Sequence, residues 1–220
     1  MLPGCAKSEP AAAPPGTPGE YAVYMPYYKD KVSLFEFMAQ NTEKRKNTVV
    51  FLGDSLTDFA EWPELLTGKR ANIVNRGIAG DTAYGVLNRL DNIVALQPAS
   101  IFLLIGINDL CVYAQPQATQ KQYEQIVAIL RTKLPRCKLY LQTLLPINNY
   151  LLKVSINNEV VAAFNERIRN MANAADNITV IDLYPLFLKD GQLDLSYTND
   201  GIHLNANGYQ VWLNAVKNKV

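Results

Sequence analysis

The chain has 220 residues, 49% of them hydrophobic, which is enough for one domain with a full core. Its 21 basic and 20 acidic residues give a net charge of +1, so the sequence offers no electrostatic attraction for nucleic acid. No apolar run reaches the roughly 20 residues that a membrane span requires. His203 is the only histidine, and Cys5, Cys111 and Cys137 form no CxxC pair, which excludes a multi-histidine or zinc-ribbon metal site.

Residues 1–20 differ in composition from the rest and are predicted to be a disordered tether, rich in Pro, Ala and Gly. Their start, Leu2-Pro3-Gly4-Cys5, resembles the end of a bacterial lipoprotein signal, in which the cysteine becomes the lipidated first residue. The basic and apolar regions of such a signal are absent from this sequence. We therefore expect a trimmed lipoprotein of the bacterial cell envelope, periplasmic or at the surface, with a lipid anchor on Cys5. A chance match and a cytoplasmic location are the alternatives.

Residues 21–220 are predicted to form a single domain in which helices and strands alternate. In chain order, the pattern predicts a helix over 31–46, a strand over 48–53, a helix over 61–68, a strand over 72–75, a helix over 83–95, a strand over 100–106, a helix over 116–134, a strand over 138–145, a helix over 156–175, a strand over 179–183 and a helix over 205–219. Such alternation implies right-handed crossovers and a mostly parallel five-stranded sheet with helices on both faces. We expect a three-layer α/β/α, flavodoxin-like fold with strand order 2-1-3-4-5.

The stretch Val49-Val50-Phe51-Leu52-Gly53-Asp54-Ser55 joins a buried strand to a turn that begins a helix. A serine at that position lies at the carboxyl edge of the sheet, beside free N–H groups of a helix start. A nucleophile needs such exposure, and an oxyanion needs such donors. The alternative is that Asp54 and Ser55 only cap the helix. Three further polar stretches follow at the same predicted edge, namely Gly80-Asp81, Asn108-Asp109 and Asp200-Gly201-Ile202-His203.

Asp200 and His203 stand three residues apart, a spacing that brings their side chains together on a compact turn. A carboxylate on one imidazole nitrogen fixes the tautomer and leaves the other nitrogen free to accept a proton, for which Ser55 is the natural donor. The backbone N–H groups of Ser55 and Gly80 and the amide of Asn108 are candidate oxyanion donors. The alternatives are a surface histidine beside a helix cap, a turn glycine and a strand-end asparagine.

These residues also carry a family resemblance, because the four blocks appear in the order of the SGNH, or GDSL-type, esterase/lipase superfamily. The blocks are Gly53-Asp54-Ser55-Leu56, Gly80-Asp81, Gly106-Ile107-Asn108-Asp109 and Asp200-Gly201-Ile202-His203. The resemblance implies that Ser55 is the nucleophile, that Asp200 and His203 complete a triad, and that Gly80 and Asn108 complete the oxyanion hole. No metal or organic cofactor is then required.

The stretches 75–82 and 200–205 are similar to the branch that holds platelet-activating-factor acetylhydrolase subunits and bacterial sialate or carbohydrate O-acetylesterases. One departure is Leu204, where many relatives have proline, which changes loop stiffness rather than chemistry. The predicted function is removal of short acyl groups, acetyl above all, from carbohydrate esters. Asn148, Asn149, Tyr150 and Tyr197 are candidate sugar contacts, with plain loop residues as the alternative.

Three other functions stay open at this point. One is a lipid-directed esterase or lysophospholipase, although no long apolar insertion between the blocks provides a lid. Another is a non-catalytic glycan-binding module that kept the fold. The last is a phosphate or dinucleotide site, which the sequence disfavours because residues 77–82 lack G-x-G-x-x-G and Pro63 stands where a Walker glycine would be. The sequence sets neither the oligomeric state nor the physiological ester.

Overall fold

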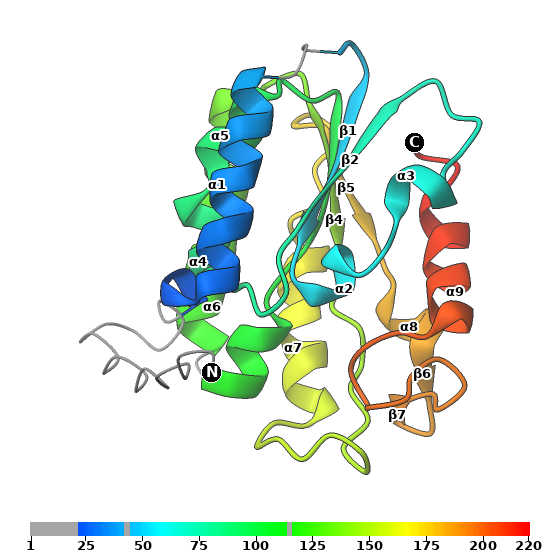
Figure 1. Cartoon of the computed structure of the whole chain (residues 1–220). Coiled ribbons are helices and arrows are strands. Elements are labelled where there is room, and N and C mark those ends of the chain that lie inside the picture. Colours follow the sequence, from blue (N-terminus) through cyan, green and yellow to red (C-terminus); the bar gives the residue numbers. More distant parts are fainter. Residues whose placement is uncertain (1–21, 42–44, 114–115) are drawn as a thin grey trace, which may run out of the picture.

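Five parallel strands form the central sheet of the computed structural model, which describes residues 22–41, 45–113 and 116–220 (Figure 1). The predicted tether over 1–20 and Cys5 lie outside the described residues. The strand order is β2-β1-β3-β4-β5, and every neighbouring pair in it is parallel. The predicted fold class and strand order are therefore confirmed. The strands are β1 Thr48–Gly53, β2 Asn72–Gly77, β3 Ser100–Leu104, β4 Lys138–Gln142 and β5 Ile178–Ile181.

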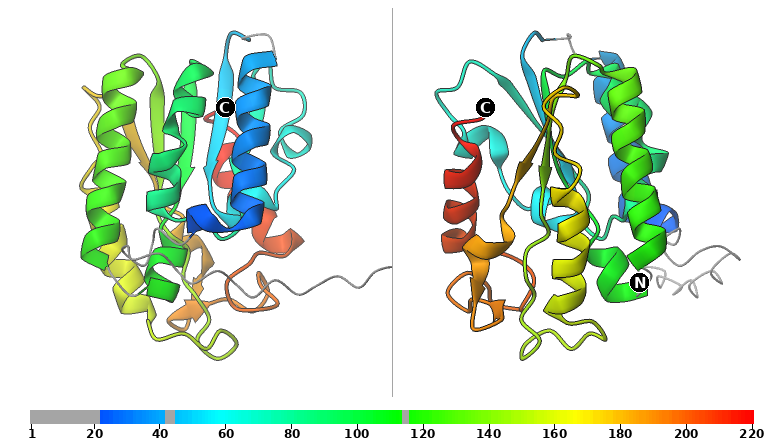
Figure 2. Two further views of the ribbon diagram at one scale, coloured as in Figure 1. Left: turned by 60° about the vertical axis from the view of Figure 1, so that its left-hand side comes forward. Right: turned by 180° about the vertical axis from the view of Figure 1, so that it is seen from behind.

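Helices cover both faces of this sheet (Figures 1 and 2). On one side lie α1 Pro26–Asn41, α4 Ala83–Asn88, α5 Leu90–Ala95 and α6 Pro116–Lys133, with α7 Asn158–Arg169 packed against α6. On the other side lie α2 Ser55–Asp58, α3 Trp62–Leu65 and α9 Ala206–Val216. Three short elements complete the chain, namely the π-helix η2 Asp109–Tyr113, the helix α8 Tyr184–Phe187 and the hairpin of β6 Leu188–Lys189 with β7 Gln192–Leu193.

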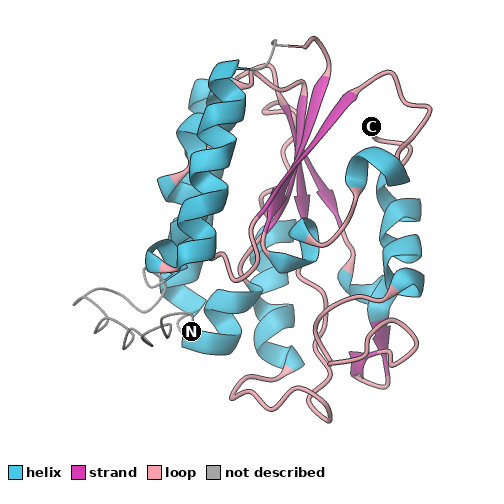
Figure 3. Cartoon of the chain, in the orientation of Figure 1, coloured by secondary structure: helices cyan, strands magenta, loops and turns pink. Residues whose placement is uncertain are grey.

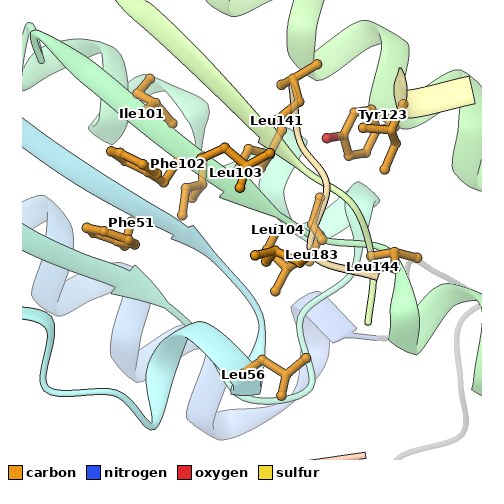
Figure 4. Close-up of a cluster of buried hydrophobic side chains, with 14 of the residues drawn as sticks. Phe51, Leu56, Ile101, Phe102, Leu103, Leu104, Tyr123, Leu141, Leu144 and Leu183 are labelled. Carbon is orange, nitrogen blue, oxygen red and sulfur yellow. The ribbon is translucent and has the colours of Figure 1, made fainter. Parts of the chain in front are cut away.

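The core is densest around β1 and β3, whose residues are all buried because helices cover both of their faces. Phe51 stacks on Trp62 at 4.0 Å and on Phe102 at 4.7 Å between ring centroids, and Trp62 meets Trp212 of α9 edge-on. Figure 4 shows Phe51 and Phe102 side by side in this cluster. Stacked aromatic pairs of this kind add to the free energy gained by burying their surface. The cluster thus holds β1, and the turn that follows it, in a fixed position.

The carboxyl ends of the strands all face the lower end of the molecule in Figure 3, where α2, the loops after β3 and β4, and the β6–β7 hairpin gather. The chain from β7 to α9 also passes there. The expectation that the four polar stretches share one edge of the sheet therefore agrees with the strand directions.

Several predicted element boundaries are wrong. The helix predicted over 31–46 begins at Pro26, where proline is well tolerated, and ends at Asn41. The helix predicted over 83–95 is two helices, because Arg89 between them has the non-helical dihedrals φ −122° and ψ 13°. The hairpin β6–β7 and the π-helix η2 are absent from the sequence-based prediction.

Candidate active site

Ser55 is the first residue of α2, directly after β1. Asp54 caps this short helix, since its Oδ1 accepts a hydrogen bond from Leu56 N at 3.0 Å. Tyr209 of α9 donates its hydroxyl to Leu56 O at 2.9 Å, which ties the same turn to the C-terminal helix. The Ser55 hydroxyl is thus presented at the edge of the sheet by a turn that is held from two sides.

The structure brings Ser55, His203 and Asp200 together, although 148 positions separate the serine from the histidine. His203 Nε2 lies 2.9 Å from Ser55 Oγ, and His203 Nδ1 lies 2.6 Å from Asp200 Oδ2. A carboxylate accepts the Nδ1 proton, so Nε2 is left as the acceptor for the serine hydroxyl. The arrangement can therefore move a proton from Ser55 to the imidazole, as a serine nucleophile requires.

Backbone donors fix the Asp200 carboxylate in this position. Its Oδ1 accepts from His203 N at 2.8 Å and from Ile202 N at 3.0 Å. Burial pushes the pKa of Asp200 upward, but the Ile202 N–H, the His203 imidazole and the His203 N–H outweigh that effect and bring the pKa to about 2. Gly201 between them has φ +93° and contacts the backbone of residue 148, so this turn needs glycine. The carboxylate stays ionised at neutral pH and able to stabilise an imidazolium.

The loop that carries Gly80 is bonded to the chain on both sides of Ser55. Ile78 N donates to Gly53 O at 3.1 Å, and Ala79 N donates to Asp58 Oδ2 at 3.0 Å. Gly80 itself has φ +79°, a conformation that glycine adopts without strain. These two bonds hold the residues just before Gly80 against the end of β1 and against α2.

The three groups expected to donate to an oxyanion, Ser55 N–H, Gly80 N–H and the Asn108 amide, come from separate parts of the chain. Asn108 Nδ2 donates one hydrogen to Asp81 O at 2.9 Å, which leaves its second hydrogen available. In the described part of the chain, neither the Ser55 N–H nor the Gly80 N–H has a backbone or side-chain acceptor. Unpaired N–H groups at a helix start and in a neighbouring loop can receive an oxyanion.

The sequence did not reveal that a buried ion pair holds this arrangement together. Arg89 Nε donates to Asp81 Oδ2 at 2.9 Å, and Arg89 Nη2 donates to Gly53 O at 3.1 Å. Both side chains of the pair are fully buried. One guanidinium therefore connects the end of β1 to the Gly80-Asp81 loop. One feature of the sequence indicated that Arg89 is buried. It stands three residues after Val86, on the core-facing side of the predicted helix.

Two further carboxyl groups are buried beside the pair. Asp54 is fully buried, and burial raises its pKa to about 7 against the opposing effect of the Leu56 N–H. Asp109 accepts from Ala83 N at 3.1 Å through Oδ2, and burial raises its pKa to about 8. Asp81 adds to both shifts through like-charge repulsion. Among the residues that the structure describes, Arg89 is the basic side chain that forms an ion pair with this acidic cluster.

His203 also contacts an aromatic side chain that the sequence analysis did not single out. The ring of Phe59 lies 5.3 Å from the imidazole, centroid to centroid, and 55% of Phe59 is exposed. Phe59 is therefore a partly exposed neighbour of the imidazole.

Among residues 22–41, 45–113 and 116–220, no cluster of three His, Cys, Asp or Glu side chains is arranged to hold a metal ion. Over the same stretches, no helix has the length and apolar character to cross a membrane.

Residues 51–211 match the GDSL-like Lipase/Acylhydrolase family. Platelet-activating factor acetylhydrolase IB subunit alpha2 of Rattus norvegicus is 29% identical over 168 residues, which cover 73% of this chain and 70% of the relative. A solved Streptococcus pneumonia protein, described as a platelet activating factor, has a TM-score of 0.78 and 26% identity, covering 88% of this chain and 92% of its own. The acetyl xylan esterase AlAXEase shares the fold with a TM-score of 0.66 at 22% identity. The match covers 79% of this chain and 99% of the esterase.

The chain therefore belongs to the GDSL-like lipase/acylhydrolase family, as the four sequence blocks predicted, and is an enzyme of the ester-hydrolysing class.

Proposed function

We propose that this enzyme removes short acyl groups, acetyl above all, from carbohydrate esters with Ser55 as the nucleophile. The observation that carries the proposal is the continuous path of two short contacts, 2.9 Å from Ser55 Oγ to His203 Nε2 and 2.6 Å from His203 Nδ1 to Asp200 Oδ2. Such a path is the arrangement that activates a serine hydroxyl at neutral pH.

The reaction then follows in two halves. Ser55 Oγ attacks the ester carbonyl carbon while His203 Nε2 takes the hydroxyl proton, and Asp200 stabilises the resulting imidazolium. The tetrahedral oxyanion accepts hydrogen bonds from Ser55 N–H, Gly80 N–H and Asn108 Nδ2. When the intermediate collapses, His203 gives its proton to the leaving alcohol oxygen. A water molecule, deprotonated by the same imidazole, attacks the acyl-enzyme and releases the acid.

The carbohydrate and acetyl parts of the proposal draw on two observations. Proteins of the same fold carry the descriptions acetyl xylan esterase and acetyl-xylooligosaccharide esterase. The loops that flank the Asp200–His203 turn carry polar side chains and an exposed tyrosine, which suit a hydroxyl-rich alcohol.

A first experiment measures hydrolysis of 4-nitrophenyl acetate by the wild type and by Ser55→Ala and His203→Ala. We expect kcat to fall at least about 10⁴-fold in each variant, because removing either member of such a unit abolishes nucleophile activation. Asn108→Ala should lose about 10²–10³-fold, the usual cost of one oxyanion donor. Near wild-type turnover in Ser55→Ala or His203→Ala would refute the proposal.

A lipid-directed esterase is the second candidate, and the half-exposed Phe59 beside His203 is the observation that favours it. The likeness to a platelet-activating factor acetylhydrolase subunit points the same way. Comparing 4-nitrophenyl acetate with the octanoyl and longer esters separates the two. A kcat/KM that falls steadily with chain length supports the short-acyl enzyme, whereas one that rises supports the lipid-directed one.

A further inference from the structure

A groove of about 420 Å³ lies between the loop after β4 and the β6–β7 hairpin. Figures 1 and 2 show these two segments side by side at the lower end of the molecule. The groove is lined by Tyr150, by the polar or charged residues Asn148, Lys189, Asp190, Gln192 and Asp194, and by Leu193 and Leu195. Asn148 N donates to Gly201 O at 2.8 Å, two residues before His203, so the wall of the groove is joined to the histidine's own turn.

Hydrogen bonds hold the two walls of the groove together before any ligand arrives. Asn148 Nδ2 donates to Leu193 O at 2.8 Å, and Asn149 N donates to Gln192 Oε1 at 2.7 Å. On the loop itself, Asn148 Oδ1 accepts from Tyr150 N at 3.1 Å. Loop and hairpin therefore form one unit, and binding here needs little additional ordering of the backbone.

Tyr150 stands out in this unit because 77% of the side chain is exposed, more than any other large hydrophobic side chain in the described stretches. The backbone that carries it is fixed, yet its ring is held open to solvent. In the same groove, Lys189 Nζ pairs with Asp194 Oδ2 at 3.7 Å, and the exposed lysine and Asp190 offer hydrogen-bond donors and acceptors to a ligand. An acyl chain placed here would have to desolvate these charges. A pyranose, with apolar C–H faces and hydroxyls that both donate and accept, matches the ring and its surroundings.

The reaction geometry also assigns this side of the site to the alcohol. The oxyanion donors surround the carbonyl oxygen, and His203 Nε2 protonates the leaving oxygen. The alcohol must therefore lie on the histidine's side of the ester. The turn that carries His203 is joined to the groove wall on this side by the bond from Asn148 N to Gly201 O.

We propose that this groove is the binding subsite for the saccharide alcohol of the substrate, with the Tyr150 ring as the surface on which a sugar ring packs. The proposal rests on ester hydrolysis at Ser55 and names where the non-reacting part of the substrate binds. Binding energy from this part of the substrate would raise kcat/KM for a saccharide ester above that for a simple phenyl ester.

The test compares kcat/KM for 4-nitrophenyl acetate with kcat/KM for the best substrate among acetylated xylotriose, acetylated glucose and O-acetylated sialic acid. The variants are Tyr150→Ala and Tyr150→Phe, and the control is Phe37→Ala, which removes another exposed aromatic ring on α1. We expect Tyr150→Ala to lower kcat/KM for the saccharide ester, relative to kcat/KM for 4-nitrophenyl acetate, about tenfold, which is equivalent to about 1.4 kcal/mol. Tyr150→Phe keeps the ring and should keep the ratio within about twofold, as should Phe37→Ala.

The outcomes separate this proposal from the function on which it rests. A wild type that cleaves 4-nitrophenyl acetate but no saccharide ester overturns the subsite and the carbohydrate part of the proposed function, and leaves ester hydrolysis at Ser55 intact. An unchanged ratio in Tyr150→Ala also overturns the subsite. A wild type that cleaves none of these esters overturns the proposed function itself.

Discussion

At the scale of single residues, Arg89 connects the two parts of the chain that carry the proposed nucleophile and the proposed oxyanion donor Gly80. Its guanidinium reaches Gly53 O, just before Asp54 and Ser55, and pairs with the Asp81 carboxylate. Asp81 in turn holds Asn108 through its backbone carbonyl. Because both charges are fully buried, each depends on the other for its stability.

Arg89→Met should lower the free energy of unfolding by about 3–5 kcal/mol, because it leaves the Asp81 carboxylate buried without its partner. The double variant Asp81→Asn/Arg89→Met should recover part of that loss, since it leaves neither charge unpaired. Urea denaturation measures both. A single variant that loses less than about 1 kcal/mol, or a double variant that is less stable than the single one, would contradict this account of the pair.

The candidate site residues that a short sequence motif marks were predictable from the sequence. Residues that act on partners far away in the chain were not. Asp200 and His203 share one turn, and Ser55 follows an apolar strand, so spacing and pattern located them. Arg89 acts on Gly53 and Asp81, and nothing in its neighbourhood in the sequence names those partners. The helical periodicity predicted one continuous helix over 83–95, whereas the structure has two helices, α4 and α5, that are separated at Arg89.

At the scale of elements, α7 holds the chain after β4 with two buried asparagines. The Asn165 amide forms hydrogen bonds with the backbone N–H and C=O of Leu144. The Asn158 amide does the same with the backbone N–H and C=O of Ile147. Asn158 also donates to Gly191 O in the turn between β6 and β7 at 2.9 Å. These amides replace the strand partners that this segment lacks, which explains why β4 ends at Gln142 although the apolar pattern predicted a strand to 145.

Asn158→Ala should lower the free energy of unfolding by about 2–4 kcal/mol, because it leaves the buried N–H and C=O of Ile147 without partners and also removes the bond to Gly191 O. Chemical denaturation gives the value. The control is Asn214→Ala on the exposed side of α9, which should change stability by less than about 0.5 kcal/mol. Equal effects of the two substitutions would show that the Asn158 bonds are not what holds the loop.

At the scale of the whole molecule, the buried carboxyl groups make stability depend on pH. Burial raises the pKa of Asp109 from 3.8 to about 8, so the folded protein keeps a proton that the unfolded chain releases. The stabilising contribution of this proton is fully present below pH 3.8, decreases as the pH rises, and is gone above about pH 8. Asp54, with a pKa of about 7, acts in the same direction.

The melting temperature of the wild type should therefore fall as the pH rises from 4 to 8 more steeply than that of Asp109→Asn, whose side chain does not titrate. Differential scanning calorimetry at several pH values measures both slopes. Identical slopes would mean that Asp109 is ionised in the folded protein throughout this range, contrary to the effect of its burial.

The strand order was predictable at this scale because alternation and crossover handedness leave few arrangements of five parallel strands. The parallel strands bring three separate stretches, after β1, β2 and β3, to one edge of the sheet, and the chain after β7 brings the Asp200–His203 turn there. The hairpin that lines the groove was not predictable, because β6 and β7 have two residues each and carry no periodic pattern.

The central claim is that His203 activates Ser55 across the edge of the sheet, and covalent labelling by a fluorophosphonate probe tests it most directly. Peptide mass spectrometry should find the phosphonyl group on Ser55 in the wild type. The rate of labelling should fall at least about 10³-fold in His203→Ala, which leaves Ser55 in place but removes the acceptor of its proton. A probe attached to another residue, or equally fast labelling in His203→Ala, would contradict the account.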